Sequence, residues 1–182
     1  MNPRECILYS GGANGAEAEC GREAERYGVQ EVNYGFEGHL MERARGVRIL
    51  TTEELERKDV SMTYVSKLMH RKYSTAPIFR KVLQSICWQV TGGQEVFVIG
   101  QIMADDTIKG GTGWGAEYAK FCNKPLHVFD QERDGWFIWR EDHWQESYSP
   151  IITKGHFTGT GTRFLKENGK KAINDLFERS FK

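Results

Sequence analysis

Short apolar runs alternate along the chain with longer segments in which apolar residues recur every three or four positions. The short runs predict strands, and the periodic segments predict helices with one buried face. The predicted strands are 6–9, 31–34, 47–50, 95–99, 125–129 and a short one near 156–157. The predicted helices are 16–27, about 53–72, 77–90, 114–122 and 163–181. This alternation is typical of an α/β fold in which helices cover both faces of a mostly parallel sheet.

The pattern changes after the strand at 125–129. Asp134-Gly135 lies between aromatic runs, which is typical of a β-hairpin turn. A chain of 182 residues fits one domain with a sizeable core. We therefore predict a single Rossmann-like three-layer sandwich over 1–182, with a small aromatic hairpin inserted at about 134–148 and a C-terminal strand–loop–helix unit at 155–182.

Charge and cysteine usage narrow the class of partner. The chain has 25 Lys and Arg against 25 Asp and Glu, and a net charge of zero argues against broad binding of nucleic acid. No stretch approaches the ~20 apolar residues that span a bilayer, and no apolar signal segment follows Met1. The four cysteines are scattered, without the spacing of a metal site. These features predict a cytoplasmic protein with no membrane partner, no metal and no resident cofactor.

Two glycine-rich segments follow predicted strands and open predicted helices. Such turns direct several backbone N–H groups, and the positive end of a helix dipole, toward one concave point that suits a phosphate. The alternative is a tight turn without a ligand, although the second segment has more glycines than a bare turn needs. The candidate ligand-binding residues are Ser10, Gly11, Gly12, Asn14 and Gly15 in the first segment, and Gly110, Gly111, Thr112 and Gly113 in the second.

A third segment, 158–162, carries glycines and hydroxyls and precedes the last helix. We predict that it forms another loop at the same sheet edge, with Thr160 and Gly161 binding the ligand and Arg163 facing the shared pocket. The alternative is that a threonine only caps the last helix and Arg163 pairs with a surface acid. His39 follows the second strand and is a further candidate at this edge, or else a surface histidine.

Two charged residues are candidates for chemistry on a bound sugar phosphate. Glu117 lies one helical turn past Gly113, where a carboxylate could orient a ribose hydroxyl or stabilise cationic charge on a sugar. It could equally be an acid that only complements the helix dipole. Arg71 ends a predicted helix and could hold a phosphate from across the sheet edge, or simply interact with the dipole of its own helix.

The segments 10–17 and 110–117 resemble the two signature loops of the SLOG superfamily, which includes DNA-processing proteins, Lonely Guy enzymes and molybdenum carrier proteins. The resemblance covers most of 6–130. The Lonely Guy pattern is Gly-Gly-x-Gly-Thr-x-x-Glu. This chain matches it at Gly110, Gly111, Gly113 and Glu117, and has Trp114 in place of the threonine. The pair Arg71-Lys72 is similar to an Arg-Lys pair of those enzymes. The resemblance implies a Rossmann-like fold, binding of a nucleotide or nucleotide-derived signal, and paired subunits.

Three functions remain open at this point. The first is binding of a nucleotide-like small molecule through the glycine-rich loops. The second is an N-glycosidase acting on nucleoside 5′-monophosphates, with Glu117 and Arg71 as its catalytic residues. The third is binding or processing of single-stranded DNA through aromatic residues at 136–144, against which the zero net charge weighs.

Overall fold

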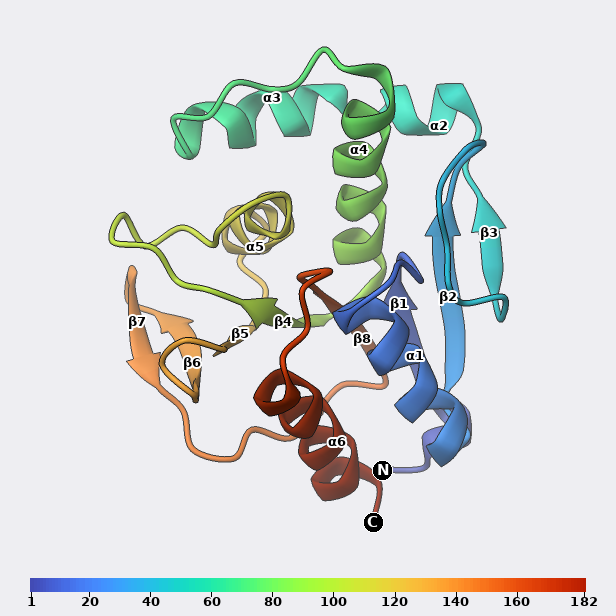
Figure 1. The fold of residues 1–182 in the computed structure, drawn as a ribbon, viewed down its shortest axis with the longest axis vertical. Coiled ribbons are helices and arrows are strands. Elements are labelled where there is room, and N and C mark those ends of the chain that lie inside the picture. Colours follow the sequence, from blue (N-terminus) through green and yellow to red (C-terminus); the bar gives the residue numbers. More distant parts are fainter.

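The structure, a computed structural model, describes all residues 1–182 and contains one sheet of eight strands with helices on both faces (Figure 1). The strands are β1 (Ile7–Ser10), β2 (Gln30–Gly35), β3 (Val47–Ile49), β4 (Glu95–Gly100), β5 (Leu126–Asp130), β6 (Gly135–Arg140), β7 (His143–Glu146) and β8 (His156–Gly161). The helices are α1 (Ala16–Tyr27), α2 (Thr52–Glu56), α3 (Asp59–Leu68), α4 (Pro77–Gly92), α5 (Thr112–Phe121) and α6 (Glu167–Phe181), after a short 3-10 turn, η1 (Pro3–Glu5). The predicted α/β sandwich is confirmed.

The strand order is β3-β2-β1-β8-β4-β5-β6-β7. The strands from β3 to β5 in this order pair in parallel, whereas β6 and β7 pair antiparallel and form the predicted aromatic hairpin. None of the helices is both long and apolar enough to span a lipid bilayer.

The strand β8 lies in the centre of the sheet, where Phe157 pairs with Leu8 of β1 and with Glu95 of β4. The prediction of a glycine loop over 158–161 is therefore wrong, and the loop begins only at Thr162. The glycine at 159 serves close packing, because a Cβ there would lie 2.9 Å from the sulfur of Cys20 in α1. A glycine required for helix–strand contact resembles, in sequence, a glycine required for a turn.

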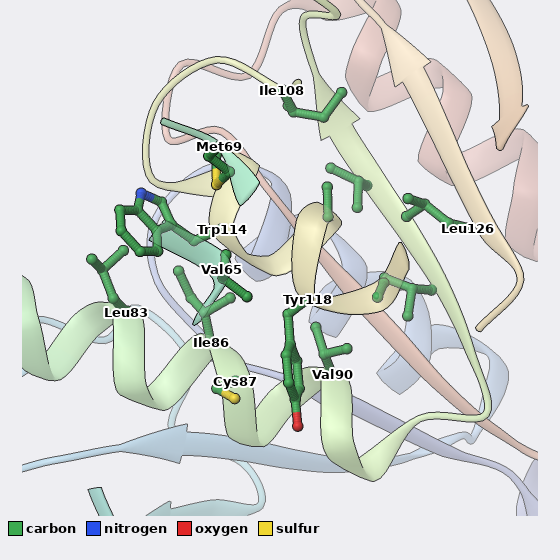
Figure 2. Close-up of a cluster of buried hydrophobic side chains, with 14 of the residues drawn as sticks. Val65, Met69, Leu83, Ile86, Cys87, Val90, Ile108, Trp114, Tyr118 and Leu126 are labelled. Carbon is green, nitrogen blue, oxygen red and sulfur yellow. The ribbon is translucent and has the colours of Figure 1, made fainter. Parts of the chain in front are cut away.

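Two apolar layers cover the sheet, one on each face. On one face α1 and α6 pack against Phe97, Ile99 and Phe157. On the other face α4 and α5 pack against Val96 and Val98, so alternate residues of β4 enter opposite cores. Figure 2 shows the second core, which also receives side chains from α3; its labelled members are Val65, Met69, Leu83, Ile86, Cys87, Val90, Ile108, Trp114, Tyr118 and Leu126.

Two helix boundaries differ from the prediction. The segment expected as one helix to about residue 72 forms α2 and α3, and α2 begins at a capping box in which Thr51 and Glu54 bond each other's backbone N–H. The last helix begins at Glu167, because the side chain of Gln131 holds the preceding loop by bonding the carbonyl of Phe164 and the N–H of Lys166.

Candidate functional site

The loops that follow β1, β8 and β4 emerge side by side at the carboxyl edge of the sheet. The N–H of Ala16, which opens α1, donates to the carbonyl of Thr162 over 3.0 Å. The N–H of Thr162 donates in turn to Ile99 of β4 over 2.9 Å. The structure therefore brings most of the glycine-loop residues predicted from the sequence to one edge, as expected for ligand sites in open α/β sheets.

The first glycine loop is occupied by a carboxylate of the chain itself. Glu17 is buried, and its Oε2 accepts a hydrogen bond from the N–H of Ala13 over 3.1 Å. Its Oε1 accepts one from the hydroxyl of Thr160 over 2.8 Å. The amide of Gln89, in the orientation that satisfies its neighbours, donates to Oε1 of Glu17 and accepts from the N–H of Gly11, each over 3.2 Å. The position expected for a ligand phosphate thus holds the side chain of Glu17.

The environment of Glu17 balances opposing effects on its charge. Burial raises the pKa of this carboxyl above its usual value, while hydrogen bonds from Thr160, Ala13, Gln89 and Gly11 oppose the rise. An ionised Glu17 would repel a phosphate at this loop, and a protonated one would still fill the space. The first loop is therefore a poor anion site in the folded chain.

The remaining polar groups of the first loop are also satisfied internally. Ser10 is buried and donates to the carbonyl of Gly159 over 2.7 Å. The carbonyl of Gly12 accepts from the N–H groups of Glu42 and Arg43, which places the β2–β3 connection against this loop. Only Asn14, at the tip, is exposed. The binding roles predicted for Ser10, Gly11, Gly12, Asn14, Gly15, Thr160 and Gly161 stay predictions.

The second glycine loop is organised by Arg71, which follows α3. Its Nη1 donates to the carbonyls of Ile108 and Gly110 over 3.1 and 3.2 Å, and its Nη2 donates to the hydroxyl of Thr107 over 2.6 Å. Gly110 adopts a φ of 72°, a conformation that favours glycine. Arg71 thus lies at the loop that opens α5, with its guanidinium beside the exposed turn of Gly110.

An exposed phenyl ring lies next to this turn. Phe79, in the first turn of α4, is 44% exposed, and its ring lies 3.7 Å from the point where a Cβ of Gly111 would be. The neighbouring Ile78 is 55% exposed and lies against Gly38 of the β2–β3 connection. Phe79 does not stand out in the sequence, because an apolar residue in a periodic helix normally belongs to the core. The available signal was the pair of bulky residues directly after Pro77.

Trp114 and Glu117, both in α5, already have partners within the chain. Trp114 is 3% exposed and packs in the core of Figure 2. Glu117 pairs with Lys120 over 3.2 Å, and the Lys120 ammonium lies 3.7 Å from the ring centre of Trp139 in the hairpin. The catalytic role of Glu117 stays a prediction, and the carboxylate already has a cationic partner.

His39 lies in the connection after β2, at the same edge of the sheet. Its ring stacks on Phe36 with centroids 4.6 Å apart, and its buried Nδ1 has no hydrogen-bond partner. Burial lowers the pKa of His39, so the imidazole is neutral at neutral pH. A neutral ring can offer one donor or one acceptor to a ligand but no charge.

Arg163 is exposed, and its backbone lies against Gly15 of the first loop. If its guanidinium reaches a bound anion, Arg163→Ala should weaken ligand binding several-fold with little change in the free energy of unfolding. Calorimetric titration and urea denaturation of the same variant check the two quantities. Unchanged binding with lost stability would leave Arg163 a purely structural residue.

One hollow of the molecule lies away from the glycine loops. It measures about 380 Å³ and opens between α6 and β6, over the buried rings of Phe129 and Trp136. No group of three or more His, Cys, Asp and Glu side chains is placed to hold a metal ion.

No model of a protein family matches the sequence, and no curated protein matches it. Among solved structures, the chain is similar to a crystal structure described as a "Putative molybdenum carrier protein" from Syntrophus aciditrophicus. The match covers 98% of this chain and 96% of that one, with a TM-score of 0.57 and 16% sequence identity. At this identity the likeness shows a shared α/β fold over nearly the full length of both chains.

Proposed function

We propose that the protein binds a nucleotide or nucleotide-derived ligand at the loop that opens α5. The observation that carries the proposal is the position of Arg71. Its guanidinium lies within 3.2 Å of the Gly110 carbonyl, at the N-terminal end of a helix and beside an exposed aromatic ring. A cation, a helix N-terminus and a ring together suit a phosphate linked to a base.

The phosphate would lie against the turn of Gly110 and Gly111. A guanidinium has five N–H donors, and Arg71 uses three in its bonds to the chain, which leaves donors for an anion. The dipole of α5 favours negative charge at the same point. The exposed ammonium of Lys109 directly precedes the turn. The first glycine loop, filled by Glu17, would form a wall of the site rather than its phosphate cradle.

The base would stack on Phe79. Stacking of a base on an aromatic side chain is worth ~1–3 kcal/mol, and the exposed ring lies in contact range of Gly111. The apolar side chain of Ile78, next to Phe79 in the chain and 55% exposed, would extend this platform.

Binding accounts for the site better than the two alternatives. Glu117, which hydrolysis of a base–ribose bond would need, is paired with Lys120. Trp139 and Trp144, which single-stranded DNA would need as stacking platforms, both lie within reach of the same Lys120 ammonium. The geometry therefore favours a small phosphorylated ligand that is held rather than cleaved.

A panel of mononucleotides, dinucleotides, ADP-ribose and inorganic phosphate, followed by calorimetry and thermal unfolding, tests this function. We expect one class of nucleotide to raise the melting temperature, since ligand at 100 times its dissociation constant adds ~2.7 kcal/mol. Arg71→Ala should weaken phosphate and nucleotide alike by ten-fold or more. Phe79→Ala should weaken the nucleotide and leave inorganic phosphate unchanged, because the ring contacts only the base.

The matched control is Tyr148→Ala, which removes a ring that is 86% exposed in the segment after β7. It should leave binding of every ligand unchanged. The function is wrong if no ligand of the panel binds, and the site is misplaced if Arg71→Ala and Phe79→Ala bind as tightly as the unchanged chain.

A further inference from the structure

The hollow of about 380 Å³ between α6 and β6 follows one side of the helix. The residues that α6 contributes to its lining recur every three or four positions, which places them on one stripe: Asn168, Lys171, Ala172, Asp175 and Arg179. Figure 1 shows α6 with the hairpin of β6 and β7, and the segment that leaves β7, to one side of it. A volume of this size lies within the range of small-molecule sites.

Hydrogen bonds at both ends of α6 hold the walls of the hollow in place. At one end the side-chain amide of Asn168 donates to the carbonyl of Gln131 and to Oδ1 of Asp134, over 2.9 and 3.0 Å. At the other end Nε and Nη2 of Arg179 donate to the carbonyl of Pro150, over 3.2 and 3.1 Å. The walls are therefore fixed before a ligand arrives, which reduces the entropy lost on binding.

Two aromatic rings form the floor of the hollow. Phe129 and Trp136 pack edge to face, with ring centroids 5.5 Å apart and planes at 65°. The indole N–H of Trp136 has no acceptor within the chain and is not sealed from solvent, whereas those of Trp88 and Trp144 donate to backbone carbonyls. A planar ring suits this floor, because aromatic rings pack favourably both in offset stacks and edge to face.

One cation at the rim of the hollow has no counter-ion. Lys171 and Asp175 neutralise each other, with 2.5 Å between Nζ and Oδ2. Asp134 lies at the opposite end of the stripe from Arg179, where it accepts from Asn168. Arg179 forms no ion pair, and its Nη1, which carries two N–H groups, makes no hydrogen bond within the chain. These free donors suit a carboxylate.

We propose that this hollow is a second ligand site, separate from the glycine loops, that binds a small molecule with a planar ring and a carboxylate. The ring lies over Phe129 and Trp136, and the carboxylate accepts hydrogen bonds from Nη1 of Arg179. Because the bond between a guanidinium and a carboxylate is charge-assisted, the ligand must carry the negative charge as well as the ring.

Titration with 2-naphthoate, 2-naphthamide and cyclohexanecarboxylate tests this class of ligand. The amide keeps the planar ring without the charge, and cyclohexanecarboxylate keeps the charge without a planar ring. We expect 2-naphthoate to bind about ten-fold more tightly than either. It should shift the indole N–H signal of Trp136 in a ¹H–¹⁵N spectrum, assigned with Trp136→Phe, and leave the signal of Trp88 in place. No shift of the Trp136 signal, or equal affinity for 2-naphthoate and 2-naphthamide, would overturn the proposal.

Two charge-removing variants of α6 test the role of Arg179. Arg179→Gln should weaken binding of 2-naphthoate about ten-fold and leave that of 2-naphthamide unchanged. The matched control is Lys170→Gln, which removes the same charge from an exposed position of α6 outside the hollow and should leave both affinities unchanged. If the two variants bind 2-naphthoate equally well, Arg179 is not the partner of the carboxylate. If Arg179→Gln loses both probes, Arg179 only supports the wall, and its assigned role is wrong.

A variant of the glycine turn separates this site from the proposed nucleotide site. Arg71→Ala should bind 2-naphthoate as tightly as the unchanged chain, because Arg71 bonds the loop before α5 and does not line the hollow. Loss of 2-naphthoate binding in Arg71→Ala would mean that the probe binds at the glycine turn and would overturn the second site.

Discussion

Glu17→Ala is expected to lower the free energy of unfolding by about 2–4 kcal/mol, because it removes the acceptor of several buried donors at once. The backbone N–H of Ala13, the hydroxyl of Thr160 and the amide of Gln89 would all lose their partner. Urea denaturation measures the change. The matched control is Glu53→Ala, which removes an exposed acid from the first turn of α2 and should cost less than about 0.5 kcal/mol.

The same variant should uncover an anion site. With the carboxylate removed, the loop around Gly11 presents free donors at a helix N-terminus, and small anions such as acetate or phosphate can enter. Added acetate should therefore raise the melting temperature of Glu17→Ala and leave that of the unchanged chain constant. If acetate stabilises neither protein, or both to the same extent, the loop is not the anion cradle that Glu17 fills.

The pH dependence of stability provides a separate check on Glu17. Because burial raises its pKa in the folded chain, the folded state holds this proton more tightly than the unfolded state does. This proton contributes its full stabilisation of the fold at pH values below the ordinary pKa of a glutamic acid. The stabilisation is lost as the pH rises through the raised pKa of Glu17 in the folded state. Glu17→Gln cannot lose a proton, so its stability relative to the unchanged chain should increase with pH across that interval. A difference that is constant with pH would mean that Glu17 has an ordinary pKa.

Most of the fold could be predicted from the sequence because proline, glycine and apolar runs mark the ends of its helices and the positions of its strands. Pro77 and the glycine pair at 92–93 fixed the limits of α4, and apolar runs located β1, β4 and β5. The central place of β8 could not be predicted. It depends on pairing with β1 and β4, far away in the sequence, and its own glycines imitate a loop.

The position of the glycine loops at one sheet edge could be predicted from the sequence, but the group that fills the first loop could not. The glycine runs indicated the carboxyl edge of the sheet correctly, because local sequence specifies a strand–turn–helix unit. That Glu17 fills the first loop depends on Thr160 in β8 and Gln89 in α4, which only tertiary structure brings together. The exposure of Phe79 likewise depends on tertiary structure, because it follows from how α4 packs and not from the periodicity of the residues in α4.

Gly113→Ala is expected to abolish ligand binding and to destabilise the fold by about 2–3 kcal/mol, because there is no space for a side chain at this position. A Cβ would lie 2.1 Å from the carbonyl of Ile108 and 2.9 Å from Nη1 of Arg71, which itself bonds that carbonyl. The carbonyl is backbone and cannot move aside alone, so the loop and Arg71 must shift together. Denaturation and calorimetric titration with the nucleotide found in the panel measure both effects.

The neighbouring glycine supplies the control for this prediction. Gly111 has ordinary helical dihedral angles, and a Cβ there would meet only the ring of Phe79, at 3.7 Å. Gly111→Ala should therefore match or exceed the stability of the unchanged chain, by up to about 1 kcal/mol. If Gly113→Ala keeps its stability yet loses the ligand, then Arg71 has moved without loss of packing. In that case the loop is needed for binding and not for stability. If Gly113→Ala loses stability and still binds the nucleotide with full affinity, the phosphate does not lie at the start of α5, and the proposed site is wrong.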